Sequence, residues 1–237
     1  MLAGLSRINS TGFCTGFRTM NHHRIMFMKC RLCGAESDEF VCGQTIYAEC
    51  PHCYYIGMDP GSLPRPESEA ARYRLHNNSY GDSRYRDWIA LFLDAVATFM
   101  PAGSRVLDFG SGPTPVPARI LSDRGCLVTI YDPYFAPDGH WRQHGWDAIL
   151  MHEVAEHLHE PGAVFTELCG LLSPGGSLCV RTRFPPRDRK ALALWRYRMD
   201  ETHVGFLGED SFAWIARHLG LKLAMLSPPD CAVLLKP

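Results

Sequence analysis

Short apolar runs with strand character alternate with helical patterns through the C-terminal part of the chain. The runs cover residues 105–109, 127–131, 148–151 and 177–181. Apolar residues at helical spacing over 116–124 and 161–172 lie between them. Strand and helix in alternation predict an α/β fold, in which helices cover a parallel sheet.

Further elements flank this alternating region. An amphipathic helix is expected over 87–100, because its apolar residues recur at helical spacing and Pro101 ends the pattern. A last helix is expected over 211–219. Two runs at 222–226 and 232–235 then predict a closing antiparallel hairpin.

Composition divides the chain into three parts. Residues 1–28 predict a disordered tail, 29–58 a small cysteine-rich unit, and 67–237 the α/β domain. Pro and Gly are frequent in the linker between the last two, and both residues interrupt helices and strands. Translation that starts at Met26 or Met28 is an alternative explanation of the tail, and a transit peptide is a weaker one.

The charge and the apolar residues bound the class of protein. A net charge of -1 with 46% hydrophobic residues is typical of a globular protein without a general attraction for nucleic acid. Charged residues and proline interrupt every long apolar stretch, so no membrane span is expected. The ten cysteines, most of them in two C-x-x-C pairs or in predicted core segments, favour a reducing, cytoplasmic compartment.

A glycine-rich turn follows the first predicted strand of the α/β domain. The sequence Val-Leu-Asp-Phe-Gly-Ser-Gly-Pro over 106–113 runs from a buried strand into a Gly-x-Gly turn, and Asp132 ends the next strand. Ligands bind beyond the carboxyl ends of such strands, and a carboxylate there can hold both hydroxyls of a ribose. Pro115 stands where a dinucleotide fingerprint needs its third glycine. This position favours a nucleoside ligand without a pyrophosphate.

Three segments resemble class I S-adenosylmethionine-dependent methyltransferases. They are Val-Leu-Asp-Phe-Gly-Ser-Gly (106–112), Tyr-Asp-Pro-Tyr-Phe (131–135) and the stretch 146–161, whose Glu-Val-x-Glu-His-Leu portion is similar to ubiquinone-type O-methyltransferases. The stretch Arg-Tyr-Arg-Leu-His-Asn-Asn (72–78) resembles methyltransferases with an N-terminal zinc ribbon. The resemblance implies a Rossmann-like, doubly wound, seven-stranded sheet and S-adenosylmethionine as the cofactor.

The resemblance also implies roles for individual residues. Asp108, Gly110 and Gly112 would line the amino-acid end of the cofactor, and Asp132 would bind its ribose. His152 and Glu153 would lie under the sulfonium, and Tyr134 would stack on the adenine. The motif at 72–78 adds two further cofactor-binding candidates, Tyr73 and His76.

The third-strand region departs from the family pattern. Too few residues separate Asp132 from Trp146 for the helix and full third strand usually found there. A shortened region is therefore expected. The acidic group that normally meets the adenine amine is left without a clear counterpart, and Asp138 is the only nearby candidate.

Two C-x-x-C pairs predict a metal site. Cys30, Cys33, Cys50 and Cys53 have the spacing of a zinc ribbon, in which two knuckles give four thiolates around one ion. Iron or a set of unmetallated cysteines is the alternative. A closed four-thiolate site leaves no position for a substrate, so we expect a structural or recognition role.

The acceptor side is expected around residues 181–203, which join the last parallel strand to the last helix. Arg and aromatic residues over 181–198 suit an anionic or nucleotide-like acceptor, or form a solvated helix face. His157 and His203 are the candidate general bases, with a structural role as the alternative. The predicted acceptor is a small molecule or a carrier-linked metabolite. RNA is the alternative acceptor, and a non-catalytic adaptor is the alternative from another class.

Overall fold

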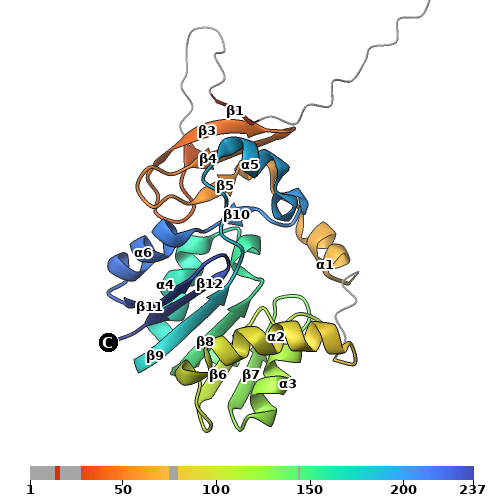
Figure 1. Cartoon of the computed structure of the whole chain (residues 1–237), viewed down its shortest axis with the longest axis vertical. Coiled ribbons are helices and arrows are strands. Elements are labelled where there is room, and N and C mark those ends of the chain that lie inside the picture. The colour runs from red at the N-terminus through yellow and green to blue at the C-terminus, as the bar shows by residue number, and fades with distance from the viewer. Residues whose placement is uncertain (1–13, 17–27, 75–79, 144) are drawn as a thin grey trace, which may run out of the picture.

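The computed structural model describes residues 14–16, 28–74, 80–143 and 145–237 (Figure 1). A small antiparallel sheet lies at one end of the molecule and a larger mixed sheet at the other. Of the predicted tail, these ranges contain only the short strand β1 (Cys14–Gly16) and Met28; the remainder lies outside the described residues. β1 pairs antiparallel with β3 (Glu36–Cys42) of the small sheet.

The larger sheet has six strands within the described ranges, in the order β11-β12-β9-β8-β6-β7. Strands β6, β7, β8 and β9 are parallel, and the β11–β12 hairpin adds an antiparallel edge on the side of β9. The bounds are β6 Arg105–Phe109, β7 Leu127–Tyr131, β8 Trp146–His152, β9 Leu172–Arg181, β11 Lys222–Ser227 and β12 Cys231–Leu235. The predicted α/β class is confirmed.

Helices cover both faces of this sheet. They are α2 (Ser83–Ala95), α3 (Val116–Asp123), α4 (Pro161–Leu171) and α6 (Glu209–His218). Side chains alternate along each strand, so Val106 packs with α2 and α3 on one face whereas Leu107 packs with α4 and α6 on the other. This arrangement confirms the doubly wound architecture.

The segment between β7 and β8 is short, as expected. It contains the 3-10 helix η3 (Gly139–Gln143), and β7 forms the edge of the sheet, so the described sheet has six strands where the resemblance implies seven. Trp141 from η3 is buried against Phe109 and Tyr131. The short segment after β7 therefore adds a large aromatic side chain to the core on this face of the sheet.

The small sheet combines two distant parts of the chain. Its order is β1-β3-β4-β5-β10, with β2 paired to β3. The bounds are β2 Met28–Lys29, β3 Glu36–Cys42, β4 Thr45–Glu49, β5 Ile56–Met58 and β10 Gly205–Phe206. Leu192 and Ala193 of α5 (Arg189–Leu194) complete its core with Val204 and Phe206. The cysteine-rich segment and the segment that contains α5 and β10 therefore share one sheet and one core, although the linker separates them in the sequence.

The remaining elements are short. Helix α1 (Pro66–Arg74) follows the linker and lies beside the gap between the two sheets in Figure 1. The other 3-10 helices are η1 Pro60–Ser62, η2 Ala97–Phe99, η4 Ala155–His157 and η5 Arg196–Met199. Within the described ranges, no helix is both long enough and apolar enough to cross a membrane.

Candidate functional site

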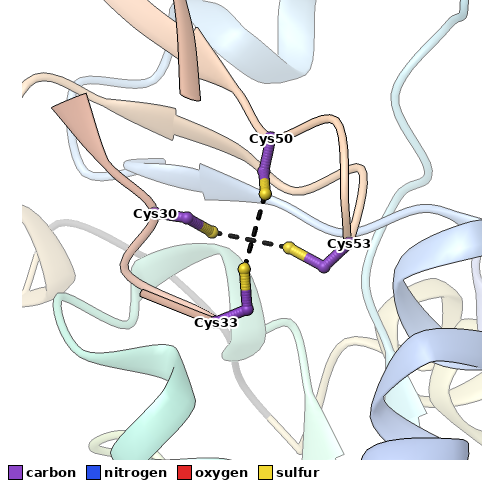
Figure 2. A group of neighbouring side chains, drawn as sticks. All are labelled: Cys30, Cys33, Cys50 and Cys53. Atoms are coloured by element: carbon purple, nitrogen blue, oxygen red, sulfur yellow. Dashed lines mark hydrogen bonds between the residues drawn. The ribbon is translucent and has the colours of Figure 1, made fainter. Parts of the chain in front are cut away.

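The four predicted metal-binding cysteines come together. The sulfur atoms of Cys30 and Cys53 lie 3.4 Å apart, as do those of Cys33 and Cys50, and all four lie within 4.8 Å of one another. Figure 2 shows them converging on one point from two loops. Four sulfurs at such distances make up the kind of donor set that a tetrahedral structural zinc site requires.

Each cysteine pair lies on a tight turn. The Gly34 N–H donates to the carbonyl of Cys30 at 2.8 Å, and the Tyr54 N–H donates to that of Cys50 at 2.9 Å. Gly34 has φ +77°, and Tyr54 has φ +57°. Positive φ suits glycine and is unusual for an aromatic residue. The second knuckle therefore keeps the left-handed turn geometry although its sequence lacks the usual glycine.

The second candidate site is a cavity of about 510 Å³ at the carboxyl ends of the parallel strands. Its walls include the glycine loop, the ends of β7 and β8, and α1. The predicted site residues on these walls are Tyr73, Asp108, Gly110, Gly112, Asp132, Tyr134, His152, Glu153, His157 and His203. Of the predicted set, His76 lies outside the described residues.

Asp132 organises the loops around the cavity. Its carboxylate accepts hydrogen bonds from the backbone N–H groups of Gly112 at 2.9 Å, Tyr134 at 2.8 Å and Phe135 at 3.1 Å. Gly110 has φ +80°, and a Cβ there would come within 2.5 Å of Val154. The glycine loop and Asp132, which the sequence analysis singled out, are thus in direct contact.

Asp108 is a buried carboxyl group in the same wall. It is 1% exposed, and its Oδ2 atom has no hydrogen-bond partner within the described structure. Burial raises the pKa of Asp108 to about 7, and the nearby Asp132 adds to the increase. A positively charged ligand group beside it would favour its ionised form.

Aromatic residues of α1 and of the loop after β7 form another wall. The rings of Tyr73 and Tyr134 lie 5.7 Å apart, and Tyr73 is 5.3 Å from the ring of His157. The Tyr134 hydroxyl donates to Glu69 at 2.7 Å, and His159 contacts the other oxygen of Glu69 at 2.8 Å. These contacts fix α1 over the cavity. Glu69 was missed by the sequence analysis because nothing in its local pattern separates it from a surface helix residue.

The end of β8 carries His152 and Glu153. The His152 ring packs against Trp88 of α2 at 4.8 Å, and burial lowers its pKa to about 3, so the imidazole is neutral. Glu153 has φ +56°, a strained conformation for a non-glycine residue. Burial and the neighbouring Glu156 raise the pKa of Glu153 to about 8.

Glu156 and Tyr197 are functional candidates that the sequence analysis did not assign. Glu156 is fully buried, and it accepts hydrogen bonds from the Tyr197 hydroxyl at 2.5 Å and the Thr182 hydroxyl at 2.7 Å. The Tyr197 hydroxyl also lies 3.2 Å from Glu153. Burial raises the pKa of Glu156. Glu156 falls within the recognised Glu-Val-x-Glu-His-Leu portion, whereas no sequence signal marks Tyr197.

His157 and His203 lie side by side, with ring centroids 4.7 Å apart. Nδ1 of His157 is 2.9 Å from the carbonyl oxygen of Thr202, and Nδ1 of His203 is 2.7 Å from that of Tyr197. Burial and the neighbouring His157 lower the pKa of His203. The predicted pair of histidines is therefore brought together on the cavity wall, although 157 and 203 lie on separate segments.

Two other predictions about this region have different outcomes. Asp138, the adenine candidate, is exposed and does not line the cavity; it accepts a hydrogen bond from the His140 N–H instead. In the 181–198 stretch, Arg181 pairs with Asp230, and Arg198 donates to backbone carbonyls of Leu192 and Ala193. Both of these arginines thus serve internal contacts.

Asp200 lies in the segment that leads to His203. Although burial acts to raise the pKa of Asp200, hydrogen bonds from Arg72 and Thr202 hold it well below its usual value. The Arg72–Asp200 ion pair at 2.9 Å connects α1 to this segment. It joins the motif that resembles the zinc-ribbon methyltransferases to the segment that carries His203.

Comparison with known proteins agrees with this geometry. The sheet order, the glycine loop and the carboxylate after the next strand define a class I methyltransferase domain. Residues 78–226 match a family described as a methyltransferase domain, and this match covers more than half of the chain. The chain therefore belongs to that family and is an S-adenosylmethionine-dependent methyltransferase. No curated protein matches it at a significant level.

Solved structures of methyltransferases are similar to this chain at low sequence identity. A SAM-dependent methyltransferase from Archaeoglobus fulgidus is 15% identical, with 64% of this chain and 94% of that chain covered and a TM-score of 0.50. A Bacillus halodurans protein described as a methyltransferase is 18% identical, with 59% and 68% covered and a TM-score of 0.49. The 1,6-didemethyltoxoflavin-N1-methyltransferase of Burkholderia thailandensis is 17% identical, with 83% and 97% covered and a TM-score of 0.47.

Proposed function

We propose that this enzyme transfers the methyl group to a small molecule, or to a metabolite attached to a carrier. One observation carries the proposal: the glycine loop, Asp132 and both candidate histidines face a single cavity of about 510 Å³. Small-molecule sites typically enclose about 300–1,000 Å³. This space suits a cofactor and a compact acceptor group.

The chemistry of the walls supports one orientation of the cofactor. Asp132 would accept hydrogen bonds from the ribose hydroxyls, and Tyr134 would stack on the adenine. Asp108 and the glycine loop would receive the charged amino-acid end, with His152 and Glu153 beneath the sulfonium. A buried carboxylate that can ionise near neutral pH is a suitable partner for the cofactor ammonium group. The methyl group would then point toward His157 and His203.

The acceptor side uses these two histidines. Methyl transfer is an in-line displacement at a cationic sulfur, so alignment and exclusion of water supply most of the catalysis. A hydroxyl acceptor must also lose a proton. In each imidazole Nδ1 faces a carbonyl oxygen and therefore carries the hydrogen, so Nε2 carries the lone pair. That nitrogen could accept the proton.

The charges of the 181–198 stretch favour a small acceptor over RNA. Arg181 is bonded to Asp230, Arg189 contacts Glu49, and Arg187 pairs with Asp210. RNA binding draws on unneutralised basic groups that contact phosphates. Because several of the arginines in this stretch already have acidic partners, they supply little net charge for a nucleic acid backbone.

The four-cysteine cluster completes the proposal. It would hold one structural zinc ion, since four thiolates satisfy a tetrahedral ion and leave no position for substrate. Thiolates that bind zinc must remain reduced. The ion would stabilise a knuckle that lies directly against the catalytic domain.

A labelling experiment tests the acceptor class. The protein is incubated with methyl-labelled S-adenosylmethionine and cell extract, and separate samples are then treated with ribonuclease or protease. We expect the label in small molecules that neither enzyme degrades, or on a protein carrier, in which case protease treatment releases it. Label that disappears only after ribonuclease treatment would instead establish RNA as the acceptor.

A further inference from the structure

A second group of metal-ligating side chains lies in the wall of the methyl-transfer cavity. The ligand atoms of Glu156, His157 and His203 all lie within 4.8 Å of one another. All three residues line the cavity. The group is distinct from the four-cysteine cluster, and its ligands are two imidazoles and one carboxylate.

Backbone carbonyls set the tautomer of both histidines. A carbonyl oxygen can only accept a hydrogen bond, so Nδ1 of His157 donates to Thr202 and Nδ1 of His203 donates to Tyr197. Nε2 of each ring therefore carries the lone pair that a metal ion needs. Metal-binding histidines in proteins usually have their second nitrogen bonded in this way.

The carboxylate of Glu156 is held in a similar manner. It is fully buried, and its two hydrogen bonds come from the neutral hydroxyls of Tyr197 and Thr182. The ion pairs found among the described residues give Glu156 no Lys or Arg partner; the nearest basic nitrogen is Nε2 of His157 at 3.8 Å. A buried carboxylate without a cation is costly. A bound cation would remove that cost.

We infer that Glu156, His157 and His203 bind one divalent transition-metal ion. Ligands about 2.1 Å from a metal lie about 3.0–3.5 Å apart when neighbouring bonds make angles of 90–110°. The 3.8 Å separation of Glu156 Oε1 and His157 Nε2 needs only a small closure to reach that geometry. Imidazole ligands suit zinc, copper, iron and nickel, and carboxylate ligands suit manganese, so this mixed set of ligands fits a transition metal.

The location of the site assigns its role and rests on the proposed function. Three protein ligands leave positions open toward the cavity, where an acceptor oxygen can bind the ion. A metal-bound hydroxyl loses its proton to solvent more easily. Its oxygen then forms a bond to the methyl carbon while the carbon–sulfur bond breaks and the sulfur keeps the electron pair. The acceptor class is therefore a hydroxyl-bearing small molecule, and the products are a methyl ether, S-adenosylhomocysteine and a proton.

The metal site and general-base catalysis make different demands on the histidines. An imidazole nitrogen bonded to a metal has no lone pair to accept a proton. His157 and His203 thus act as metal ligands in this inference. In place of the general-base role predicted from the sequence, the two histidines hold the ion in position.

Manganese titration of the full-length, zinc-loaded protein tests the inference. Free Mn²⁺ gives an electron paramagnetic resonance signal that is lost on binding, and the thiolate cluster prefers softer metals. We expect one Mn²⁺ per chain in a site that Glu156→Gln and His203→Ala each weaken at least about tenfold. His140→Ala is the matched control, because His140 is exposed and lies outside the cavity; its affinity should change less than about twofold.

A second measurement separates folding and cofactor binding from metal binding. Tyr197→Phe keeps the ring but removes the hydrogen bond to Glu156, and loss of such a supporting group typically weakens a metal site about 10–100-fold. S-adenosylhomocysteine affinity is measured in the same variants. Intact cofactor affinity with weakened Mn²⁺ binding supports the site. The metal site is overturned if the protein does not bind Mn²⁺, or if binding survives both Glu156→Gln and His203→Ala. If the unmutated protein does not bind S-adenosylhomocysteine, the proposed function is overturned instead.

Discussion

The two clusters of metal-ligating side chains in this chain differ in completeness. The cysteine cluster has four sulfur ligands from two knuckles, and three of the four cysteines are fully or nearly fully buried. The Glu156, His157 and His203 cluster has three ligands and faces a cavity. A closed site stabilises structure, whereas an open site can hold a substrate atom. We therefore propose a role in folding for the cysteine cluster and a role in the reaction for the Glu156, His157 and His203 cluster.

The two clusters are also connected. Arg31, between the first two cysteines, donates hydrogen bonds to the carbonyls of His159 and Val204, both at 2.7 Å. These residues lie next to the segments that carry His157 and His203. A Cβ on Gly162 would come within 2.4 Å of the carbonyl oxygen of Leu32, so the knuckle packs closely on the start of α4. The ribbon thereby supports the backbone of the acceptor side.

Cys50→Ser should have the largest effect, because it removes one of four zinc ligands. Structural zinc binding contributes about 10–16 kcal/mol of apparent free energy in small zinc domains. We expect one zinc ion per chain in the unmutated protein. The variant should lose the metal, and its ribbon should no longer unfold cooperatively. Metal analysis and thermal unfolding measure this. Cys126→Ser is the control, since Cys126 is buried outside the cluster. A metal-free but folded ribbon in the unmutated protein would disprove the closed zinc site.

His203→Asn or His157→Asn tests the open cluster. Each histidine is a ligand of the inferred ion or, in the proposed function without that ion, a general base, and in either role its loss should lower turnover by about 10²–10⁴-fold while cofactor affinity stays nearly constant. Steady-state kinetics with the identified acceptor measure it, and His218→Asn on the exposed end of α6 is the control. Full activity of both variants at every pH would show that alignment alone drives the transfer.

Arg31→Lys tests the connection between the clusters. Lysine keeps the charge but lacks the planar fork that reaches several carbonyls at once. We expect turnover to fall by about tenfold, because small displacements of catalytic groups are costly. Zinc content and S-adenosylhomocysteine affinity should be unchanged. Arg65→Lys on the exposed linker is the control. An unaltered rate would mean that the knuckle does not position the histidines.

Asp108→Asn should produce the smallest and most pH-dependent effect. Burial raises the pKa of Asp108 from 3.8 to about 7, so the folded protein binds a proton that the unfolded chain loses as pH rises through this interval. The cost of ionising the buried group therefore lowers stability between about pH 4 and 7. The variant should unfold at a higher temperature than the unmutated protein at pH 8, and the difference should vanish near pH 4. Asp87→Asn, exposed on α2, should show neither effect.

The sequence predicted local elements and the cofactor loop better than long-range pairing. Strands β6 and β7 begin and end where the apolar runs do, since each is a short apolar segment bounded by turns. The β5–β10 pairing could not be predicted, because Gly205 and Phe206 carry no strand pattern of their own. Tyr197 was missed for a similar reason: its place beside Glu156 depends on a 3-10 turn and on contacts between distant segments.

Cofactor binding tests the central claim most directly, because every role assigned to the cavity requires S-adenosylmethionine there. Calorimetric titration with S-adenosylhomocysteine compares the unmutated protein with Asp132→Ala and with the control Asp138→Ala, which alters an exposed carboxylate on the same loop. Hydrogen bonds to a charged group contribute about 1.5–3 kcal/mol each, so Asp132→Ala should lose at least about tenfold in affinity and Asp138→Ala almost none. Equal affinity of the unmutated protein and Asp132→Ala, or tighter binding of a nicotinamide dinucleotide than of S-adenosylhomocysteine, would contradict the account.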